Sequence, residues 1–473
     1  MTKNYYREST PTELVIKDAT DINSCVSTHI GFKGIFSDLY KNIFAGIDLK
    51  SRSNQILQDL AIMRIVNPKS KRYTANESSN YGFDLNLDSI YKAMDRIDDD
   101  IIQQIKHIAY RNTKRLLNIK ESDDLDLLFY DLTTLSFETN CQNALREFGF
   151  SKDGKHQHVQ IMLALIITKS GLPVGYELFC GNMYEGNTLI PTLKGLKEKY
   201  KINKVIVVAD SGLISKNNVD QIKDIGFDYI IGGRIKNSPK QIKEEVFNQS
   251  GYEDLNEDMR CKVYDICEKN RDKLLIYHSK KRAAKDLYDR NKSLEKIMKQ
   301  VGKDVKSMLS GALKKSYVKL SEDAKIEIDQ DKLEEIAKFD GYFSLQTNVK
   351  DFKMMEIIDH YRGLWQIEQT FRISKYNLKI RPVFHYSVER IKAHFAICYV
   401  ALVILRTLEY TMIKNNCYTP IEQLFSLLDK VIVTSISSKG NNYNICNDFP
   451  EELIPIYKCT KTKIPPRFLS LTK

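Results

Sequence analysis

The sequence lacks the cysteine spacing of a zinc-binding or disulfide-stapled domain. None of its nine cysteines forms a Cys-x-x-Cys pair, although such close pairs are typical of structural zinc sites. The chain has 473 residues against a usual ~100–200 per domain, which leaves ample length for several domains and a buried core. A small stapled scaffold is therefore excluded, and a reducing cytoplasm fits this cysteine usage best. The cysteines are Cys25, Cys141, Cys180, Cys261, Cys267, Cys398, Cys417, Cys446 and Cys459.

The sequence also lacks the long apolar runs of a membrane protein. Its longest apolar stretch, residues 395–405, is shorter than the ~20 residues that a helix needs to cross a bilayer. Residues 1–10 are polar and do not follow the basic, apolar, small-residue order of a secretory signal. No membrane partner is expected.

Acidic residues are fewer than basic ones. The chain has 61 Asp and Glu against 72 Lys and Arg, a formal net charge of +11. Between residues 260 and 320 there are 18 basic and 7 acidic residues, so this stretch alone equals the charge excess of the chain. A polyanion is the usual partner of such a chain, which makes nucleic acid the leading interpretation. A solvated, salt-bridged helical surface is an equally weighted alternative.

Strand-length and helix-length patterns predict an α/β protein of five segments. Residues 1–120 have amphipathic helical patterns at 55–66 and 87–117 and form a predicted helical domain. Residues 121–233 alternate in the order βββαβαβ, with predicted strands at 125–137, 156–168, 172–179, 204–209 and 229–232 and predicted helices at 187–200 and 217–225. The run KVIVVA at 204–209 is apolar on both sides, as a central parallel strand must be.

The second half of the chain is predicted to interrupt and then complete this sheet. Residues 234–340 are polar and charged and are predicted to be a basic insertion with a Lys-rich helical core at 280–303. Residues 341–414 return to a strand at 341–347 and two long helices at 351–376 and 387–414. Residues 415–473 are predicted to be a helical tail with one helix at 421–431.

Three acids occupy positions that an apolar environment disfavours. Asp131 lies within the first predicted strand, on the face it shares with Phe129 and Thr133, where an unneutralised carboxylate costs stability. Asp210 directly follows the buried run KVIVVA, at the strand end that carries active sites in open α/β sheets. Glu368 interrupts the apolar stripe of the predicted helix 351–376.

The predicted helix 351–376 also brings three polar groups onto one line. Tyr361, Glu368 and Lys375 are spaced seven residues apart, so in a continuous α-helix each lies within ~20° of the next. A phenol, a carboxylate and an ammonium group would then share the side that faces the sheet.

Each acid taken singly also has a structural interpretation. A strand Asp can pair with an Arg, an Asp after a strand can cap a helix, and Glu368 can pair with Arg372. Taken together, three carboxylates that converge on one point repel each other and call for a divalent cation. All-oxygen ligands suit Mg²⁺ or Mn²⁺, and two such ions can catalyse phosphoryl transfer on a nucleic-acid backbone.

Three stretches resemble the catalytic signatures of one enzyme family. YDLTTLSFET at 130–139, VVADSGLIS at 207–215 and YRGLWQIEQTFRISK at 361–375 are similar to those of DDE-type insertion-sequence transposases, and more narrowly of the insertion-sequence-four superfamily, whose signature is Tyr-x2-Arg-x3-Glu-x6-Lys. The resemblance covers residues 50 to 410. It implies an RNase H-like, or retroviral-integrase-like, core with an insertion between the fifth strand and the helix carrying the Glu.

The resemblance also implies roles for particular residues. Asp131, Asp210 and Glu368 correspond to the catalytic, metal-binding triad, and Tyr361 and Lys375 to contacts with the transposon-end backbone. The family's Arg falls at Leu364 in this chain, and the two arginines that could replace it are Arg362 and Arg372.

Further residues give weaker signals. Lys280, Lys281, Arg282 and Lys285 in the insertion are candidate phosphate contacts that would not read sequence. Arg64, Lys69, Lys71 and Arg72 are candidates for recognition of the element's ends by the N-terminal domain.

Two other signals favour structural roles. The pair His156 and His158 is predicted not to be a metal site, because no third ligand lies at a usable spacing. Trp365, the one tryptophan, is predicted to be a core residue, with stacking on nucleic acid as the alternative.

The resemblance thus implies a cut-and-paste DNA transposase. The partners that it implies are double-stranded DNA, as terminal inverted repeats and as target, and a second copy of the chain in a homodimer on DNA, and the expected location is the bacterial cytoplasm. Its expected cofactor is Mg²⁺ or Mn²⁺, as two ions. The alternatives are a stand-alone RNase H-like nuclease and a DNA-binding regulator without catalysis.

Overall fold

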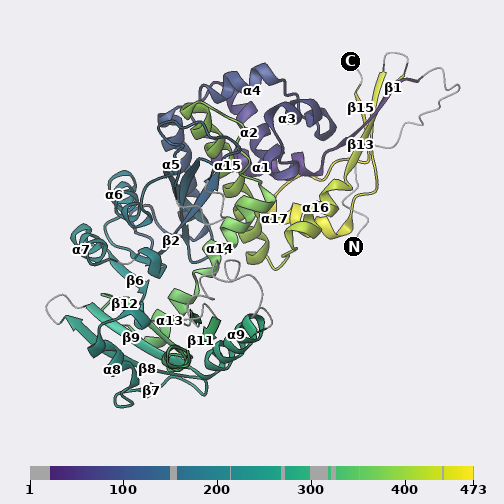
Figure 1. Cartoon of the computed structure of the whole chain (residues 1–473). Coiled ribbons are helices and arrows are strands. Elements are labelled where there is room, and N and C mark those ends of the chain that lie inside the picture. Colours follow the sequence, from purple (N-terminus) through teal and green to yellow (C-terminus); the bar gives the residue numbers. More distant parts are fainter. Residues whose placement is uncertain are drawn as a thin grey trace. The chain divides into compact units, whose positions relative to one another are not determined.

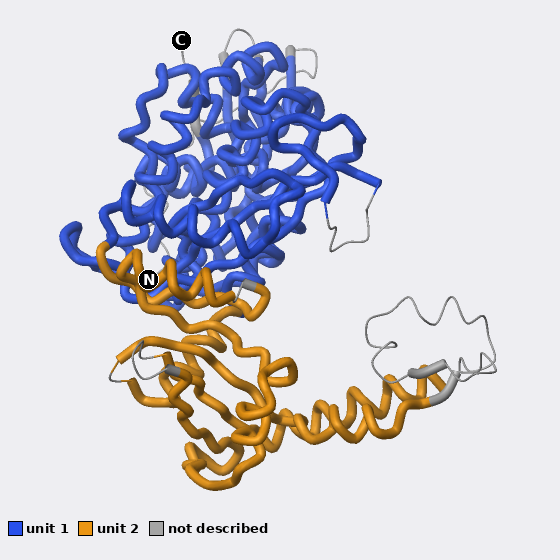
Figure 2. The backbone as a smooth tube through the Cα atoms, turned by 60° about the vertical axis from the view of Figure 1, so that its left-hand side comes forward, with its two compact units in different colours: residues 1–202, 365–473 blue, residues 203–364 orange. Residues whose placement is uncertain are grey.

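The computed structural model describes residues 22–149, 157–213, 215–267, 272–298, 318–320, 326–350, 352–438 and 441–471. The chain divides into two compact units, shown in different colours in Figure 2. Unit 1 comprises residues 1–202 and 365–473, and unit 2 comprises residues 203–364. This division is coarser than the five predicted segments, which stay a prediction. The predicted mixed α/β fold class is confirmed, since each unit combines helices with a sheet (Figure 1).

Unit 1 is built around a bundle of helices contributed by both ends of the chain. The predicted helical character of residues 1–120 is confirmed for residues 31–116, while residues 22–29 form a strand and residues 1–21 lie outside the described residues. Side-chain caps begin several of its helices: Asn86 and Asp98 accept backbone N–H bonds from Ser89 and Ile101 at 2.8 and 2.9 Å. The helices of unit 1 are α1 (Gly31–Phe44), α2 (Ser51–Val66), α3 (Lys71–Glu77), α4 (Leu87–Met94), α5 (Asp99–Leu116), α6 (Leu189–Tyr200), α14 (Trp365–Arg372), α15 (Val388–Lys414), α16 (Ile421–Asp429) and α17 (Ile454–Thr460).

The central helix of this bundle is α15. It is long and apolar enough to cross a membrane by length and composition, but 94% of its most apolar window is buried inside unit 1. Helices α1, α2, α4, α5 and α17 and strand β4 pack around it. Its apolar surface is therefore satisfied by protein contacts, as in the core helix of a globular domain.

The sheet of unit 1 begins with the strands predicted from the sequence. Strands β2 (Leu127–Ser136), β3 (Gln160–Thr168) and β4 (Pro173–Cys180) pair antiparallel in the order β4-β3-β2. All residues of β3 are buried, and Asp131 is the one residue of β2 that is not. The Tyr130 side of β2 is closed by a hydrogen bond of 2.8 Å from the Tyr130 hydroxyl to Thr188.

A second sheet in unit 1 joins the two ends of the chain, and the sequence did not predict it. Strand β1 (Ile22–His29) pairs with β13 (Ile432–Ser438), which pairs with β14 (Asn441–Cys446) and then β15 (Phe468–Leu471), all antiparallel. The helix predicted at 421–431 is confirmed as α16, but the described part of residues 415–473 also contains three strands, so the prediction of a helical tail was incomplete. β-Structure assembled from segments some 400 residues apart has no local signal beyond weak strand propensity.

Unit 2 contains the parallel pair predicted from the apolar runs. Strand β5 (Ile206–Ala209) pairs parallel with β6 (Asp228–Gly232), and α7 (Lys216–Ile225) connects them. Strand β12 (Tyr342–Thr347) adds antiparallel to β6, which confirms the predicted return to strand character after the insertion. Helix α13 (Met354–Arg362) packs on β5 and β6.

In the residues that the structure describes, the predicted insertion continues this sheet and adds helices to it. Strands β9 (Asp272–Ser279), β8 (Met259–Cys267) and β7 (Glu253–Asp254) extend the order β6-β12 outward, and β10 (Val318–Leu320) pairs with β11 (Ile326–Ile328) separately. The predicted Lys-rich helix is confirmed as α9 (Lys280–Met298), with α8 (Lys240–Phe247) and α12 (Gln330–Ala337) as further helices. The high charge of the insertion sequence hid its strands from prediction, because only alternate residues of an outer strand need to be apolar.

Two of the basic residues proposed for recognition of the element's ends lie in the core. Arg64 and Lys71 are only 6% and 5% exposed. Arg64 donates to the Lys379 carbonyl oxygen at 3.5 Å. Buried near them are His385, His394 and Cys398, with the Cys398 sulfur 3.6 Å from His394 Nε2. Arg64 and Lys71 are therefore structural, and the prediction of a DNA-contacting role for them was wrong.

Protonation of Lys71 and His385 is disfavoured in the folded protein. Burial, together with the positive charge of Arg64, lowers the pKa of Lys71 from 10.5 to about 7. Burial and the charges of Lys71, Arg390 and Arg64 lower the pKa of His385 to about 3. Above pH 7 the unfolded chain then binds more protons at Lys71 than the folded chain does. Stability should therefore rise with pH from about 7 towards 10.

Replacing Lys71 with Met should flatten this dependence. We expect the slope of the free energy of unfolding against pH, measured by urea denaturation between about pH 7 and about pH 9, to fall by up to ~1.4 kcal/mol per pH unit. Lys69→Met is the matched control, because Lys69 is exposed and should leave the slope unchanged. Equal slopes for Lys71→Met and the wild type would contradict the assignment.

Candidate active site

Asp131 is the polar exception on an otherwise buried strand. It lies at the middle of β2, opposite the buried Leu165 of β3, and is half-buried. One carboxylate oxygen accepts the Leu132 backbone N–H at 2.7 Å. A charged side chain on such a strand needs access to water or to a partner, because burial of an isolated carboxylate is costly. The sequence-based placement of Asp131 within an apolar strand is confirmed.

Glu368 lies on the helix that packs against the same sheet. Helix α14 contacts both β2 and β3, so Asp131 and Glu368 belong to packed elements of unit 1. Glu368 is exposed and lies in the first turn of α14, where a carboxylate interacts favourably with the helix N-terminus. Among the described residues, Glu368 forms no salt bridge with Arg372, and both side chains are exposed. The alternative of a buried Glu368–Arg372 ion pair was therefore wrong.

The predicted continuous helix 351–376 is divided into three parts. Helix α13 ends at Arg362, Gly363 caps it by donating to the Asp359 and His360 carbonyl oxygens, and α14 begins at Trp365. A five-residue π-helical turn, Ile373–Asn377, follows α14. Glycine weakens a helix at Gly363, and Ser374 bonds the carbonyl oxygen of Thr370 one turn back, which disfavours regular continuation.

This division overturns the predicted line of three polar residues. Tyr361 lies on α13 in unit 2, Glu368 lies on α14 in unit 1, and Lys375 lies in the π-helical turn. The 20° relation holds only along one uninterrupted α-helix. The residues of the signature are therefore contiguous in sequence but shared between two units.

Asp210 and Tyr361 form the part of the candidate site that lies in unit 2. Asp210 is exposed and directly follows β5, as predicted, ahead of a short 3₁₀ turn at Ser211–Leu213. The Tyr361 hydroxyl donates to one Asp210 carboxylate oxygen at 3.4 Å, a long hydrogen bond. Tyr361 is thus placed to orient the Asp210 carboxylate, a contact that the sequence had not suggested.

Gly232 makes room for this tyrosine. A Cβ atom at Gly232 would overlap the Tyr361 hydroxyl oxygen and lie 3.1 Å from Cζ of the ring, with Ser211 Cβ at 3.3 Å. The phenol therefore occupies a slot at the end of β6 that only glycine leaves open. The sequence offered just a glycine pair after a strand, which has many explanations, so this role was missed.

The remaining predicted contact residues are distributed over both units. Arg362 is exposed at the end of α13, where it donates to the Met259 sulfur at 2.8 Å and lies 3.6 Å from Asp359. Arg372 is exposed in the last turn of α14, and Lys375 is half-buried. The two arginines that could replace the family arginine at Leu364 thus lie in different units.

The basic cluster at the start of α9 is exposed, but its members differ in their engagement. Arg282 bonds Asp286 at 2.8 Å and lies over the Phe343 ring at 5.0 Å, and Lys280 donates to the Glu257 carbonyl oxygen at 2.9 Å. Lys281 and Lys285 are exposed, and in the described residues no ion pair holds their ammonium groups. These two lysines are the ones available to an external anion.

The structure bears on two of the weaker signals. Trp365 is 55% exposed, so the prediction of a core role was wrong and its stacking alternative stays open. His156 lies outside the described residues, while His158 is half-buried ahead of β3.

No metal centre is formed within the part of the chain that the structure describes. In those residues, no group of three or more His, Cys, Asp or Glu side chains is arranged to hold a metal ion. The predicted triad has two members in unit 1, Asp131 and Glu368, and one in unit 2, Asp210. Its role as a joint metal site stays a prediction.

Comparison with known proteins relates the chain to a described protein family. Residues 122–404 match the model of the family described as transposase DDE domain, a match that spans more than half of the chain. No curated protein matches the chain in sequence. Among solved structures, it is similar to piggyBac transposase in a synaptic complex with hairpin DNA, with 10% identity, 84% of this chain and 76% of that chain covered, and a TM-score of 0.42.

The slot at Gly232 gives a structural prediction that is independent of activity. Gly232→Ala should lower the free energy of unfolding by ~1–3 kcal/mol, because the added methyl group overlaps the Tyr361 hydroxyl. Adding Tyr361→Phe removes that oxygen and should recover part of the loss, which a double-mutant cycle by chemical denaturation measures.

Gly233→Ala is the matched control for this cycle. Its methyl group would overlap Ser344 rather than Tyr361, so Tyr361→Phe should give it no recovery. Equal coupling free energies of Tyr361→Phe with Gly232→Ala and with Gly233→Ala would contradict a specific contact between Gly232 and Tyr361.

Proposed function

Because the chain belongs to the transposase DDE-domain family, we propose that it is a cut-and-paste DNA transposase. In this proposal the enzyme cleaves DNA at the ends of a mobile insertion element. The freed 3′-hydroxyl group then attacks a phosphodiester of target DNA. The substrate is double-stranded DNA, as terminal inverted repeats and target, and the enzyme acts as a homodimer in the bacterial cytoplasm.

The observation that carries this proposal is the span of the family match. Residues 122–404 include all three predicted catalytic acids, Asp131, Asp210 and Glu368. Each has access to solvent, since Asp131 is half-buried and the other two are exposed. A carboxylate that acts on a large polymer must be reachable from outside the fold, and these three are.

The donor chemistry of these acids fits a hard divalent cation. Three carboxylates supply only oxygen ligands, which suit Mg²⁺ or Mn²⁺. We propose that Asp131, Asp210 and Glu368 together hold the metal, expected as two ions. When bound, such ions lower the pKa of the attacking water and neutralise charge on the phosphate and leaving oxygens.

The chain's own residues then have positioning and binding roles. Tyr361 orients the Asp210 carboxylate through its hydroxyl and, together with Lys375, contacts the backbone of the element's end. Arg362 or Arg372 supplies the guanidinium that the family places at Leu364. Trp365, exposed one turn before Glu368, is available for stacking. No Ser or Tyr nucleophile is required, because the attacking groups are water and the DNA hydroxyl.

Substitution of the acids tests the catalytic assignment. Asp131→Asn, Asp210→Asn and Glu368→Gln should each lower Mg²⁺-dependent cleavage of an element-end duplex by ~10²-fold or more, because each removes one metal ligand. Binding of the same duplex, measured by fluorescence anisotropy, should change little. Glu389→Gln, an exposed acid of unit 1, is the matched control and should stay active. Full activity of Asp210→Asn would refute the assignment.

A strand-transfer assay, which measures joining of element ends to target DNA, separates a transposase from the two alternatives. A labelled 3′-end should appear in covalent linkage with target DNA. A stand-alone nuclease would give cleavage without joining, and a DNA-binding regulator would give binding without Mg²⁺-dependent cleavage.

Substitution of the exposed lysines of α9 tests whether this helix contacts DNA. Replacing Lys281 and Lys285 by Gln should weaken DNA binding for all sequences alike. It should also reduce the slope of log affinity against log salt by ~0.9 for each phosphate that a lysine no longer neutralises. Arg282→Gln should have a smaller effect, since Asp286 already neutralises that guanidinium. An unchanged salt slope in the double variant would place the DNA elsewhere.

A further inference from the structure

Two cysteine side chains are in contact in the C-terminal part of unit 1. The Cys417 thiol donates to the Cys459 sulfur at 3.6 Å, and both residues are half-buried. Among the cysteine side chains that the structure describes, they are the one pair whose sulfurs are in contact. The two residues are 42 positions apart in sequence, so no local spacing indicated the pair.

The C-terminal end of α15 fixes the position of Cys417. Asn416 takes a left-handed conformation with φ 54°, and its backbone N–H donates to the Ile413 carbonyl oxygen at 3.1 Å. The Cys417 backbone N–H donates to the Met412 carbonyl oxygen at 3.0 Å. These two bonds around a left-handed residue form the Schellman motif that ends many helices. The backbone of Cys417 is therefore held by the long core helix of unit 1.

Helix α17 holds Cys459 on the other side of the contact. This helix packs on α15 and on α1. The Cys459 thiol also lies 3.2 Å from the Ile456 carbonyl oxygen of its own helix. Tyr457, the buried neighbour of Ile456, donates to the Gly31 carbonyl oxygen of α1 at 3.2 Å. The contact between the two sulfurs is thus set by two helices that are packed in the same core.

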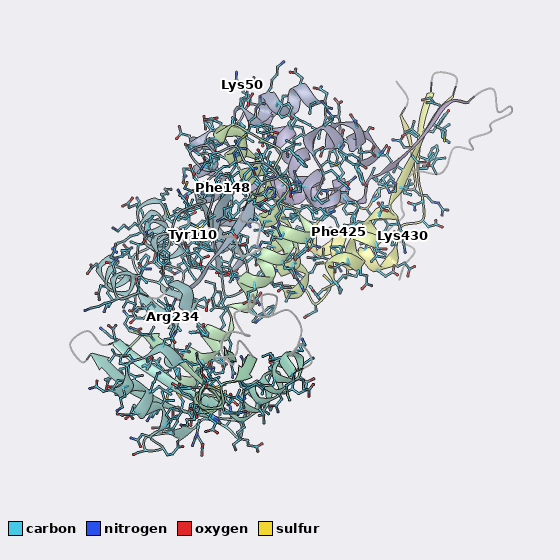
Figure 3. All side chains as sticks on the ribbon, viewed as in Figure 1. Lys50, Tyr110, Phe148, Arg234, Phe425 and Lys430 are labelled. Carbon is cyan, nitrogen blue, oxygen red and sulfur yellow. The ribbon has the colours of Figure 1, made fainter. Side chains whose placement is uncertain are left out.

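The segment between the two cysteines is anchored to this core as well. It contains α16, β13, β14 and most of α17. Helix α16 packs through Phe425 on Phe32 and Phe36 of α1, with ring centroids 5.5 and 6.5 Å apart (Figure 3). A covalent bond between Cys417 and Cys459 therefore closes a segment whose two ends already meet in the folded protein.

A small movement separates this thiol contact from a disulfide. A disulfide has an S–S distance of ~2.05 Å, so the two sulfurs must approach each other by ~1.5 Å. Rotation about the Cα–Cβ bonds moves each sulfur while the helices that carry it keep their positions. The weak bond of the Cys459 thiol to the Ile456 carbonyl oxygen is the contact that is lost.

We propose that Cys417 and Cys459 form a reversible disulfide when the protein meets a low-molecular-weight disulfide. This inference goes beyond the proposed function and does not rest on it. The Cys417 thiolate attacks one sulfur of the oxidant, forms a mixed disulfide and releases one thiolate. The Cys459 thiolate then attacks the Cys417 sulfur, which forms the Cys417–Cys459 bond and releases the second thiolate. The protein loses two electrons and two protons, and the oxidant is reduced to two thiols.

The environment of Cys459 favours this order of steps. Burial, together with the neighbouring Cys417 thiol, raises the pKa of Cys459 to about 12. Because the thiolate is the nucleophile, Cys459 is a poor first attacker of an external disulfide. Its own step is intramolecular, and the closeness of the two sulfurs compensates for the small fraction of thiolate.

Oxidation of the full chain by oxidised glutathione tests the pair. Mass spectrometry of a non-reducing digest should find one peptide pair joined through Cys417 and Cys459. The midpoint of thermal unfolding should rise by ~3–8 °C relative to protein kept in dithiothreitol, because the bond closes a loop in the unfolded chain and lowers its entropy. Addition of dithiothreitol to the oxidised protein should reverse both changes.

Serine variants separate this pair from the other thiols. Cys459→Ser should abolish the joined peptides and the rise in midpoint, with a circular dichroism spectrum like that of the wild type, and Cys417→Ser should behave in the same way. Cys25→Ser removes an exposed thiol on β1 and is the matched control, which should keep both effects.

Three results would each overturn the proposal. One is recovery of Cys417 and Cys459 as free thiols or as separate glutathione adducts after oxidation. Another is a disulfide from either residue to a different cysteine of the chain or to a second copy. The third is an equal rise of the unfolding midpoint in oxidised Cys459→Ser and in the oxidised wild type.

Discussion

The cost of placing a carboxylate beside apolar strands governs the arrangement of this protein. An isolated ionised group in the interior is strongly unfavourable, so an acid on a buried strand must keep access to water, to a hydrogen-bond donor or to a cation. Asp131 keeps partial exposure on a strand whose other residues are buried, and Asp210 stands just beyond the buried β5. Glu368 is exposed in the first turn of its helix. The acids are therefore positioned where water can solvate their charge and where an outside substrate can reach it.

The break between α13 and α14 gives the signature segment a double role. Helix α13, which carries Tyr361, packs on β5 and β6 beside Asp210, whereas helix α14, which carries Glu368, packs on β2 and β3. A short stretch of chain thus contributes to both units, and the residues around Gly363 and Leu364 link them.

The basic residues of the chain have different structural environments. Arg64 and Lys71 are buried and contribute to the core at an electrostatic cost, with the pKa of Lys71 lowered by burial. Lys281 and Lys285 are exposed on α9 and available to an anion, while Arg282 is neutralised by Asp286. Strands β1, β13, β14 and β15 contain no Lys or Arg. Net charge alone therefore favours a polyanion partner but does not identify the residues that meet it.

The sequence by itself determined most of the strands and helices between residues 125 and 232 and singled out three acids as candidates, because hydrophobic periodicity and strand-end position are properties of neighbouring residues. The order βββαβαβ and the placement of Asp131 and Asp210 follow from such patterns. Only the tertiary structure decided that Gly363 divides a helix, that Gly232 admits Tyr361, that Arg64 and Lys71 lie inside, and that the chain ends form one sheet. Each of these depends on contacts between residues distant in sequence, whose energies override local propensity and leave no local pattern to read.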